Sequence, residues 1–142
     1  MIKQVSVFLE NRKGQLSDIC HVISEQGINM HALFLADTRD YGVVRIFCDT
    51  PHAAQHALSS AGYRALLTDV CAFHVKNEKG ALAELLSTLD AQGIDVRYGY
   101  CYSSSESSSI NVIKVDGERA VEQYLVDRGF TPAKAEEIYV VD

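Results

Sequence analysis

The sequence predicts an α+β fold made of two copies of one unit, each an antiparallel sheet with its helices on one face. Two observations predict it: a repeat along the chain, and hydrophobic patterns that switch between periods of two and 3.6 residues. Each copy has the order strand, helix, strand, strand, helix, strand. We expect the first unit at residues 1–68 and the second at residues 69–142.

The repeat is clearest between residues 4–30 and 70–96. At an offset of 66 residues, seven of the 27 ungapped positions are identical, including the pairs Gly14 with Gly80 and Gly27 with Gly93. Further along the chain the offset becomes 67, which indicates one extra residue in a loop of the second copy. Identities that extend over a whole unit indicate a duplication.

The first strand and first helix of each unit follow from hydrophobic spacing. Val5, Val7 and Leu9 alternate, as a half-buried strand requires. The next segment has one helical stripe that ends before a glycine, made of Leu16, Ile19, Cys20 and Ile23. The second unit repeats this stripe with Leu82, Leu85, Leu86 and Leu89.

The rest of each unit is predicted as a hairpin and a second helix. Residues 30–36 and 43–49 are expected to pair as strands around a turn at 37–42, and Pro51 suits the first turn of a helix. In the second unit the serine-rich stretch 103–109 is expected to be the hairpin loop. Three alternating tyrosines precede it, and they suit a packing or dimer surface, or a ligand wall: Tyr98, Tyr100 and Tyr102.

Composition excludes several classes of function. The chain has 142 residues, of which 47% are hydrophobic and 23% charged, with a net charge of −6. Nucleic-acid binding needs a cluster of Lys and Arg, and the sequence has no such cluster. We expect neither a secretory signal nor a membrane helix, and therefore a cytoplasmic protein. The widely spaced cysteines are interpreted as small buried hydrophobes: Cys20, Cys48, Cys71 and Cys101.

No arrangement of residues points to catalysis. His52 and His56 are four residues apart, a spacing that can hold a metal, but no third ligand is evident and a solvated helix face is the favoured interpretation. No histidine falls in a nucleophile motif, and no acid–base pair stands out. The sequence therefore predicts no metal, no cofactor and no enzymatic activity.

Two short motifs carry a resemblance to a known family. Residues 11–16 (Asn-Arg-Lys-Gly-Gln-Leu) followed by Gly-Ile-Asn at 27–29, and residues 77–82 followed by Gly-Ile-Asp at 93–95, resemble the ACT domain. This is a small ferredoxin-like regulatory fold that senses amino acids. The resemblance covers nearly the whole chain as two tandem copies. This layout is similar to that of the stand-alone tandem ACT proteins. The resemblance implies a free amino acid as ligand and a homodimer, although the chain could instead pair its own two halves. Lys13 and Lys79 depart from the proline usual in the family.

The start of the first helix suits the binding of a zwitterion. The N–H groups of Gln15, Leu16 and Ser17 and the positive end of the helix dipole favour a carboxylate. Gly14 permits close approach, and Asn11 offers a side-chain amide, although Asn in this position can also be only a turn former.

By resemblance to the family, Asn29 faces the ligand together with the Asn11 position, across an interface between ACT units. His31 could contact a polar ligand or be an ordinary surface residue. The predicted ligand-binding residues are Asn11, Gly14, Gln15, Leu16, Asn29, Met30, His31 and Leu33 in the first unit, and Asn77, Gly80, Ala81, Leu82, Asp95 and Val96 in the second.

Three functions remain compatible with the sequence. The favoured one is an amino-acid-binding regulatory or sensor protein. The second is a ligand-free interaction subunit that docks on a metabolic enzyme through open sheet faces. The third, a small enzyme, is disfavoured.

Overall fold

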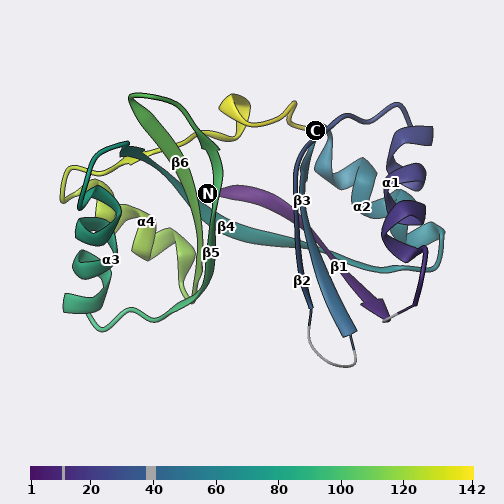
Figure 1. Ribbon diagram of the computed structural model, residues 1–142, viewed down its shortest axis with the longest axis horizontal. Coiled ribbons are helices and arrows are strands. Elements are labelled where there is room, and N and C mark those ends of the chain that lie inside the picture. The colour runs from purple at the N-terminus through teal and green to yellow at the C-terminus, as the bar shows by residue number, and fades with distance from the viewer. Residues whose placement is uncertain (11, 38–40) are drawn as a thin grey trace. The chain divides into compact units, whose positions relative to one another are not determined.

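The computed structural model describes residues 1–10, 12–37 and 41–142 (Figure 1). The prediction for Asn11 and part of the expected turn at 37–42 therefore lie outside the described residues. By packing, the chain divides into two compact units. We call residues 3–68 with 135–142 the first unit, and residues 1–2 with 69–134 the second unit.

The first unit has the predicted order of elements. β1 (Ile2–Glu10), α1 (Gln15–Glu25), β2 (Met30–Asp37), β3 (Tyr41–Cys48) and α2 (Pro51–Ser60) lead into β4 (Arg64–Lys76), whose first residues belong to this unit. The strand order is β2-β3-β1-β4. β3 pairs antiparallel with both β1 and β2, and Val7 lies opposite Val44.

The second unit repeats this arrangement. The later residues of β4 are followed by α3 (Ala81–Ala91), β5 (Val96–Ser104), β6 (Ser108–Val115), α4 (Glu118–Val126) and the short β7 (Thr131–Pro132). The strand order is β5-β6-β4-β7. Because both units have the ferredoxin-like order with antiparallel pairing, the predicted fold class is confirmed.

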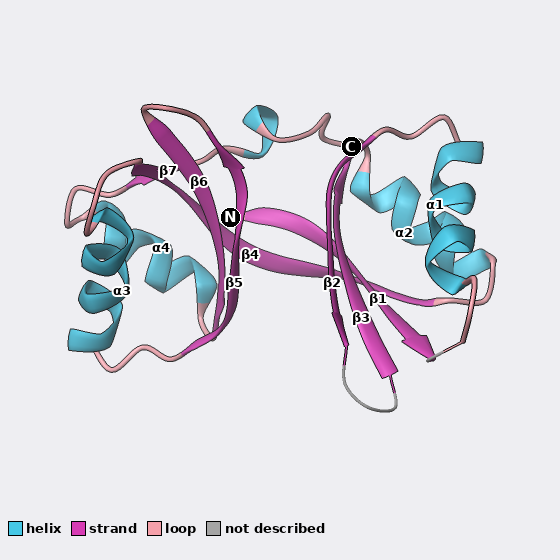
Figure 2. Ribbon diagram, in the orientation of Figure 1, coloured by secondary structure: helices cyan, strands magenta, loops and turns pink. Residues whose placement is uncertain are grey.

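Each unit has its core between its sheet and its two helices, which lie on the same side of the strands (Figure 2). In the first unit the stripe on α1 is confirmed, with Ile19 and Ile23 fully buried and Leu16 packed partly against them. Pro51 begins α2, as predicted. The buried residues of this core are Val5, Val7, Leu9, Ile19, Ile23, Val44, Ile46, Cys48, Ala54, Leu58 and Ala65.

The stripe on α3 is narrower than predicted. Leu85 and Leu89 are buried, but Leu82 is 42% exposed and Leu86 is 39% exposed. These two side chains lie to one side of the line that faces the sheet, since successive residues turn by about 100° around a helix. The spacing found the helix correctly and overestimated the width of its buried face.

The serine-rich loop is also shorter than predicted. β5 extends to Ser104 and β6 begins at Ser108, so only residues 105–107 connect the strands. The Ser105 N–H donates to the carbonyl of Ser108 at 2.8 Å, which closes a tight turn. Tyr98, Tyr100 and Tyr102 are half-buried and alternate with exposed residues, as predicted, although the pairing register of β5 with β6 shifts between Cys101 and Ser103.

The four cysteines are free, and they differ in environment. Cys48 and Cys71 are fully buried, as predicted, and burial raises the pKa of Cys48 to about 12 and that of Cys71 to about 11. Cys20 is partly buried. Cys101 is exposed, so the prediction is wrong for this residue, which lies near the end of β5.

The last residues of the chain pack on the first unit. The 3-10 helix η1 (Ala135–Glu137) leads to Ile138 and Tyr139, which are buried. The rings of Tyr139 and Phe47 stack with their centroids 6.3 Å apart, and the Lys3 N–H donates to the Tyr139 hydroxyl at 2.7 Å. No helix within the described ranges is long and apolar enough to span a bilayer.

Candidate functional site

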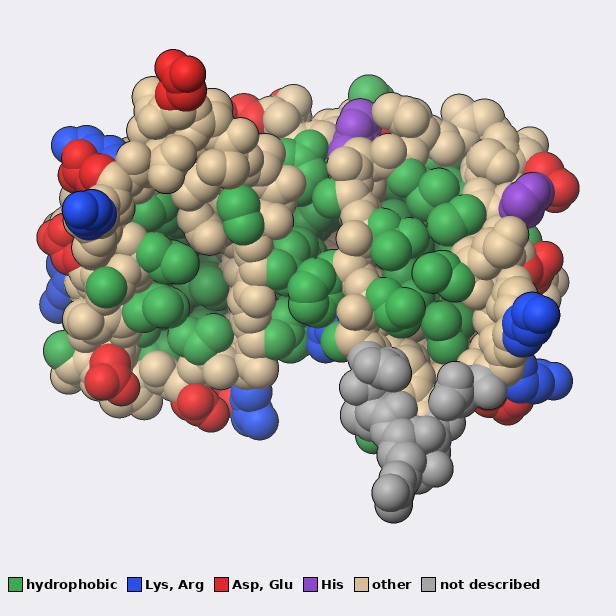
Figure 3. All heavy atoms as spheres, viewed as in Figure 1, with side chains coloured by type: hydrophobic (Ala, Val, Ile, Leu, Met, Phe, Trp, Pro, Cys, Tyr) green, Lys and Arg blue, Asp and Glu red, His purple; other side chains and the backbone are tan. Residues whose placement is uncertain are grey.

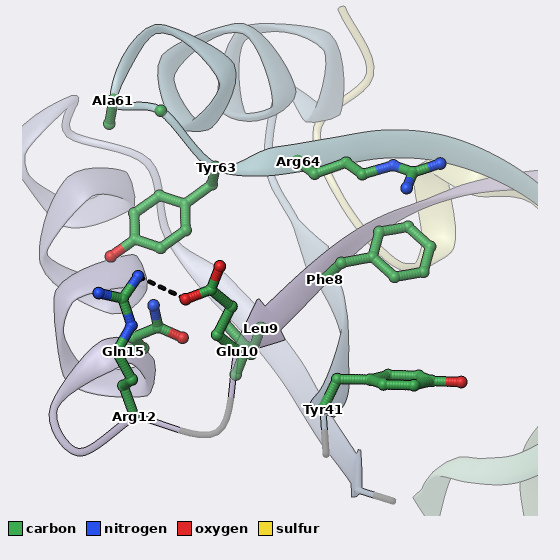
Figure 4. A pocket seen from close by; sticks show the side chains of 10 residues that line it. Phe8, Leu9, Glu10, Arg12, Gln15, Tyr41, Ala61, Tyr63 and Arg64 are labelled. Atoms are coloured by element: carbon green, nitrogen blue, oxygen red, sulfur yellow. Dashed lines mark ion pairs between the residues drawn. The ribbon is translucent and has the colours of Figure 1, made fainter.

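A cavity of about 750 Å³ lies in the first unit, where β1 ends and α1 begins (Figure 4). Side chains reach it from the ends of four elements. Its lining combines acidic, basic, amide and aromatic groups: Phe8, Leu9, Glu10, Arg12, Gln15, Tyr41, Ala61, Gly62, Tyr63 and Arg64.

Two tight turns bring these side chains together. After β1 the Arg12 N–H donates to the Glu10 carbonyl at 2.7 Å, and Gly14, at φ 89°, lets α1 begin at Gln15. After α2 the chain reverses at Gly62, at φ 93°, and the Tyr63 N–H donates to a carbonyl of the last helical turn. Both turns lie at the same end of the unit because β4 begins beside the end of β1.

The charges at the cavity are balanced in part. Glu10 and Arg12 form an ion pair of 2.6 Å, and both side chains are largely exposed, so the pair adds little stability. The guanidinium of Arg64 lies 5.0 Å from the ring centre of Phe8. The cavity therefore presents two guanidinium groups and one carboxylate to a ligand.

Gln15 lines the cavity, and the amide oxygen of its side chain has no hydrogen-bond partner among the described residues. This Oε1 atom is also shielded from solvent. A buried acceptor left unsatisfied costs about 1–3 kcal/mol. If the Gln15 side chain turns so that this oxygen faces the cavity, a ligand that donates a hydrogen bond to it removes that cost.

The hydroxyl of Tyr63 already has a hydrogen-bond partner within the protein. It donates to the carboxylate of Asp18 on α1. This hydrogen bond raises the pKa of Tyr63 above its ordinary value. The Tyr63 ring is thereby fixed above the start of α1 (Figure 4).

A second cavity, of about 350 Å³, lies at the corresponding place in the second unit. Each residue that lines the first cavity has a counterpart, 66 or 67 residues later, that lines the second. The lining is His74, Val75, Lys76, Glu78, Ala81, Glu84, Ser108, Arg128, Gly129, Phe130 and Thr131. The duplication therefore extends to the cavities themselves.

The chemistry of the two cavities differs. Lys76 and Glu78 take the places of Glu10 and Arg12, which reverses both charges. Ala81 stands where the first cavity has its shielded amide. The second cavity therefore cannot present the same groups to a ligand in the same orientation.

Two of the predicted residues in the first unit adjoin the first cavity. Gln15 lines it, and Gly14 has the left-handed conformation that starts α1. Leu16 packs against the core. That any of these binds a ligand stays a prediction.

The structure places the predicted β2 residues elsewhere. α1 has 11 residues, about 16 Å of helix, and Asn29 follows its far end. The Asn29 carbonyl accepts the N–H of Asp49 at 2.9 Å, and His31 Nε2 lies 2.7 Å from a carboxylate oxygen of Asp49. The N–H of Val140 and then His31 lower the pKa of Asp49. Within the first unit these residues, with Met30 and Leu33, are not brought to the cavity.

The predicted residues of the second unit are also divided. Ala81 lines the second cavity, and the Asn77 amide donates to the Ser105 carbonyl at 2.6 Å. Gly80 has the same left-handed conformation as its counterpart, at φ 83°, while Leu82 is exposed. Asp95 and Val96 line a separate hollow at the other end of α3.

Several cavity residues were missed by sequence reasoning. Phe8, Glu10 and Arg12 adjoin the predicted turn, whereas Tyr41 and Tyr63 come from elsewhere in the sequence. The predicted order of elements could have located Tyr63, because in this fold the last strand of a unit begins beside the end of the first strand. Within the described residues, no group of three or more His, Cys, Asp or Glu side chains is placed to hold a metal ion.

Comparison with known families resolves the fold family. Residues 1–136 match the family described as the ACT domain pair. The chain belongs to this family. An ACT domain pair is a regulatory fold, and the resemblance inferred from the two glycine motifs is confirmed. No curated protein sequence matches the chain.

Solved structures agree with this assignment. Protein BT0572 from Bacteroides thetaiotaomicron has a TM-score of 0.88 and 29% identity, with 96% of this chain and 94% of that chain covered. The regulatory subunit of aspartate kinase from Thermus thermophilus, in its ligand-free form, has a TM-score of 0.61 and 14% identity over 89% and 92%. The corresponding subunit from Thermus flavus has a TM-score of 0.58 and 14% identity over 88% and 90%. At this identity the two kinase subunits share the fold alone.

Proposed function

We propose that this ACT domain pair is a non-catalytic regulatory protein that binds a free amino acid in the cavity of its first unit. The family assignment supports a regulatory, amino-acid-sensing role. Kinase regulatory subunits with the same fold offer a parallel in which such a pair controls an enzyme. We place this role in the cytoplasm, and a metabolic enzyme is the partner we favour.

One observation carries the choice of site. The first cavity offers cationic, anionic and unpartnered acceptor groups within one space, as the head group of an amino acid requires. The ligand carboxylate would be bound by the guanidinium group of Arg12. Its ammonium group would donate to the Gln15 Oε1 atom and to Glu10, which is an acceptor in its ionised form.

The proposal includes a homodimer that completes the site. β2 is the edge strand of its sheet, and Leu33, Phe34 and Leu35 on it are exposed. Figure 3 shows hydrophobic side chains gathered on the face of the first unit turned to the viewer. Apolar side chains on an edge strand favour association. Residues near Asn29 of a second copy would then approach the ligand, and sedimentation equilibrium tests the assembly.

The same exposed side chains favour the second candidate function, a ligand-free subunit that docks on an enzyme. The two functions differ in their response to amino acids. Binding of an amino acid stabilises the folded state by RT ln(1 + [L]/Kd), about 2.7 kcal/mol at a hundred times Kd. A docking subunit without a ligand gains nothing.

A thermal-shift screen of the twenty amino acids tests the proposed function. We expect one or a few to raise the melting temperature of the wild-type protein. Gln15→Ala should then weaken binding at least tenfold by calorimetry, because the ligand ammonium loses its acceptor. Glu78→Ala, in the second cavity, is the control for a change at the corresponding turn of the second unit and should leave the affinity unchanged.

Two outcomes would contradict the proposal. The first is the absence of any thermal shift at millimolar concentrations of all twenty amino acids. The second is equal binding by the wild-type protein and Gln15→Ala, which would put the ligand elsewhere.

A further inference from the structure

The first cavity has two chemically different sides, and they lie on either side of Glu10 (Figure 4). On one side are Arg12 and Gln15 at the start of α1, beneath the ring of Tyr63. On the other side are Phe8, Tyr41 and Arg64. A head group held on the first side would direct its side chain toward the second.

The second side is built mainly from flat groups. Phe8 is 36% exposed and Tyr41 is 54% exposed, and they come from neighbouring strands. Tyr41 lies opposite Glu10 in the β1–β3 register, so Phe8 is its diagonal neighbour on the same face, within reach of an aromatic ring. The Arg64 guanidinium lies over the Phe8 ring.

Flat, exposed groups of this kind favour some ligand side chains over others according to the shape of the side chain that packs on them. An aromatic ring can stack against phenyl, phenol and guanidinium planes, whereas an aliphatic side chain only covers apolar area. A small side chain would leave both rings exposed in a cavity of about 750 Å³. The side chain favoured by this surface is therefore a ring.

The second unit provides an internal comparison. At the positions of Phe8, Tyr41 and Arg64 it has His74, Ser108 and Thr131, and its cavity is about half as large. The aromatic surface thus belongs to the first cavity and does not follow from the fold.

From these observations we propose that the first cavity selects amino acids with an aromatic side chain, whose ring lies against Phe8 and Tyr41. The proposal rests on the proposed function and adds the chemical class of its ligand. Arg64 has a positioning role, since it holds the Phe8 ring from the side away from the ligand.

Equilibrium titration of the full-length protein with single amino acids tests this selectivity. We expect L-phenylalanine, L-tyrosine or L-tryptophan to bind at least tenfold more tightly than L-leucine, L-aspartate and glycine. The chain contains no tryptophan, so the emission of bound L-tryptophan reports its occupancy directly. Calorimetry measures the other ligands.

Two variants separate selectivity from folding. Phe8→Leu keeps an apolar side chain, and Tyr41→Ser introduces the residue of the second unit. Each should lower the affinity for the aromatic ligand about tenfold and leave that for L-leucine unchanged, with the melting temperature of the free protein retained. Ser108→Ala, in the second cavity, should change neither affinity.

The outcomes distinguish this proposal from the one it rests on. If a non-aromatic amino acid binds best and Gln15→Ala abolishes its binding, the proposed function stands and the aromatic selectivity is wrong. Selectivity is equally wrong if both variants keep the wild-type ratio of affinities. If no amino acid binds, both proposals fail.

Discussion

At the scale of single residues, the repeat places a left-handed backbone at the same point in both units. Gly117, which precedes α4, has φ 71°, and its counterpart Thr50, which precedes α2, has φ 45° and ψ 63°. For a β-branched residue this region is an outlier and costs about 1–2 kcal/mol. The Thr50 side chain makes no capping hydrogen bond to α2 that would offset the cost.

Exchange of the two residue types should therefore have opposite effects. We expect Thr50→Gly to raise the free energy of unfolding by up to about 1 kcal/mol, since relief of strain exceeds the extra entropy of an unfolded glycine. Gly117→Thr should lower it by about 1–2 kcal/mol. Urea unfolding of both variants measures this, and a loss of stability in Thr50→Gly would contradict it.

At the scale of elements, the leucines of α3 that share the predicted hydrophobic stripe should contribute unequally to stability. Leu85→Ala should lower the free energy of unfolding by about 2–5 kcal/mol, because it leaves a cavity in the core. Leu86→Ala, the next residue, should cost less than about 1 kcal/mol because its side chain is half exposed. Chemical denaturation of the two variants checks the difference, and equal losses would mean that Leu86 is buried in solution.

Elements were the part of the structure that the sequence predicted best. Hydrophobic period and glycine position are local signals, and they located α1, α3 and the turns at Gly14 and Gly80. Burial within a helix is not local, since it depends on how far the sheet extends beneath it. This is why Leu82 and Leu86 were expected to be buried and are not.

The candidate site was predictable only where it is local. Gln15 and Ala81 were named because they follow the turn glycines. Tyr41 and Arg64 reach the cavity from strands distant in sequence, and only the β1–β3 register and the position of β4 bring them there. Asn29 was joined to the site by family resemblance, and one helix length separates it from the cavity within its own unit.

At the scale of the whole molecule, the units do not coincide with the two halves of the sequence. Residues 135–142 pack with the first unit and residues 1–2 with the second. The repeat could not predict this, because the aligned pairs end near Gly129 and the terminal segment has no counterpart at the end of the first copy. Where one ACT domain ends in the sequence and the next begins stays a prediction.

Removal of residues 135–142 should destabilise the first unit. It takes away Ile138 and the Tyr139 ring on Phe47, and it takes away the Asp142 carboxylate, which accepts the His52 and Ala53 N–H groups at 3.1 and 2.9 Å. We expect a loss of about 3 kcal/mol or more. Hydrogen exchange should rise in β3 and α2 before α3 and α4, and the reverse order would contradict the assignment. Val141→Ala is the control.

The reversed charges of the duplicated cavities have a consequence for dose response. Since the two cavities of one chain differ in chemistry, they should not bind the same amino acid with similar affinity. We expect a hyperbolic binding curve that saturates at one ligand per polypeptide. Any sigmoidal curve would then have to originate in contacts between separate polypeptides. Gene duplication would then have produced two units with the same fold and only one amino-acid-binding site.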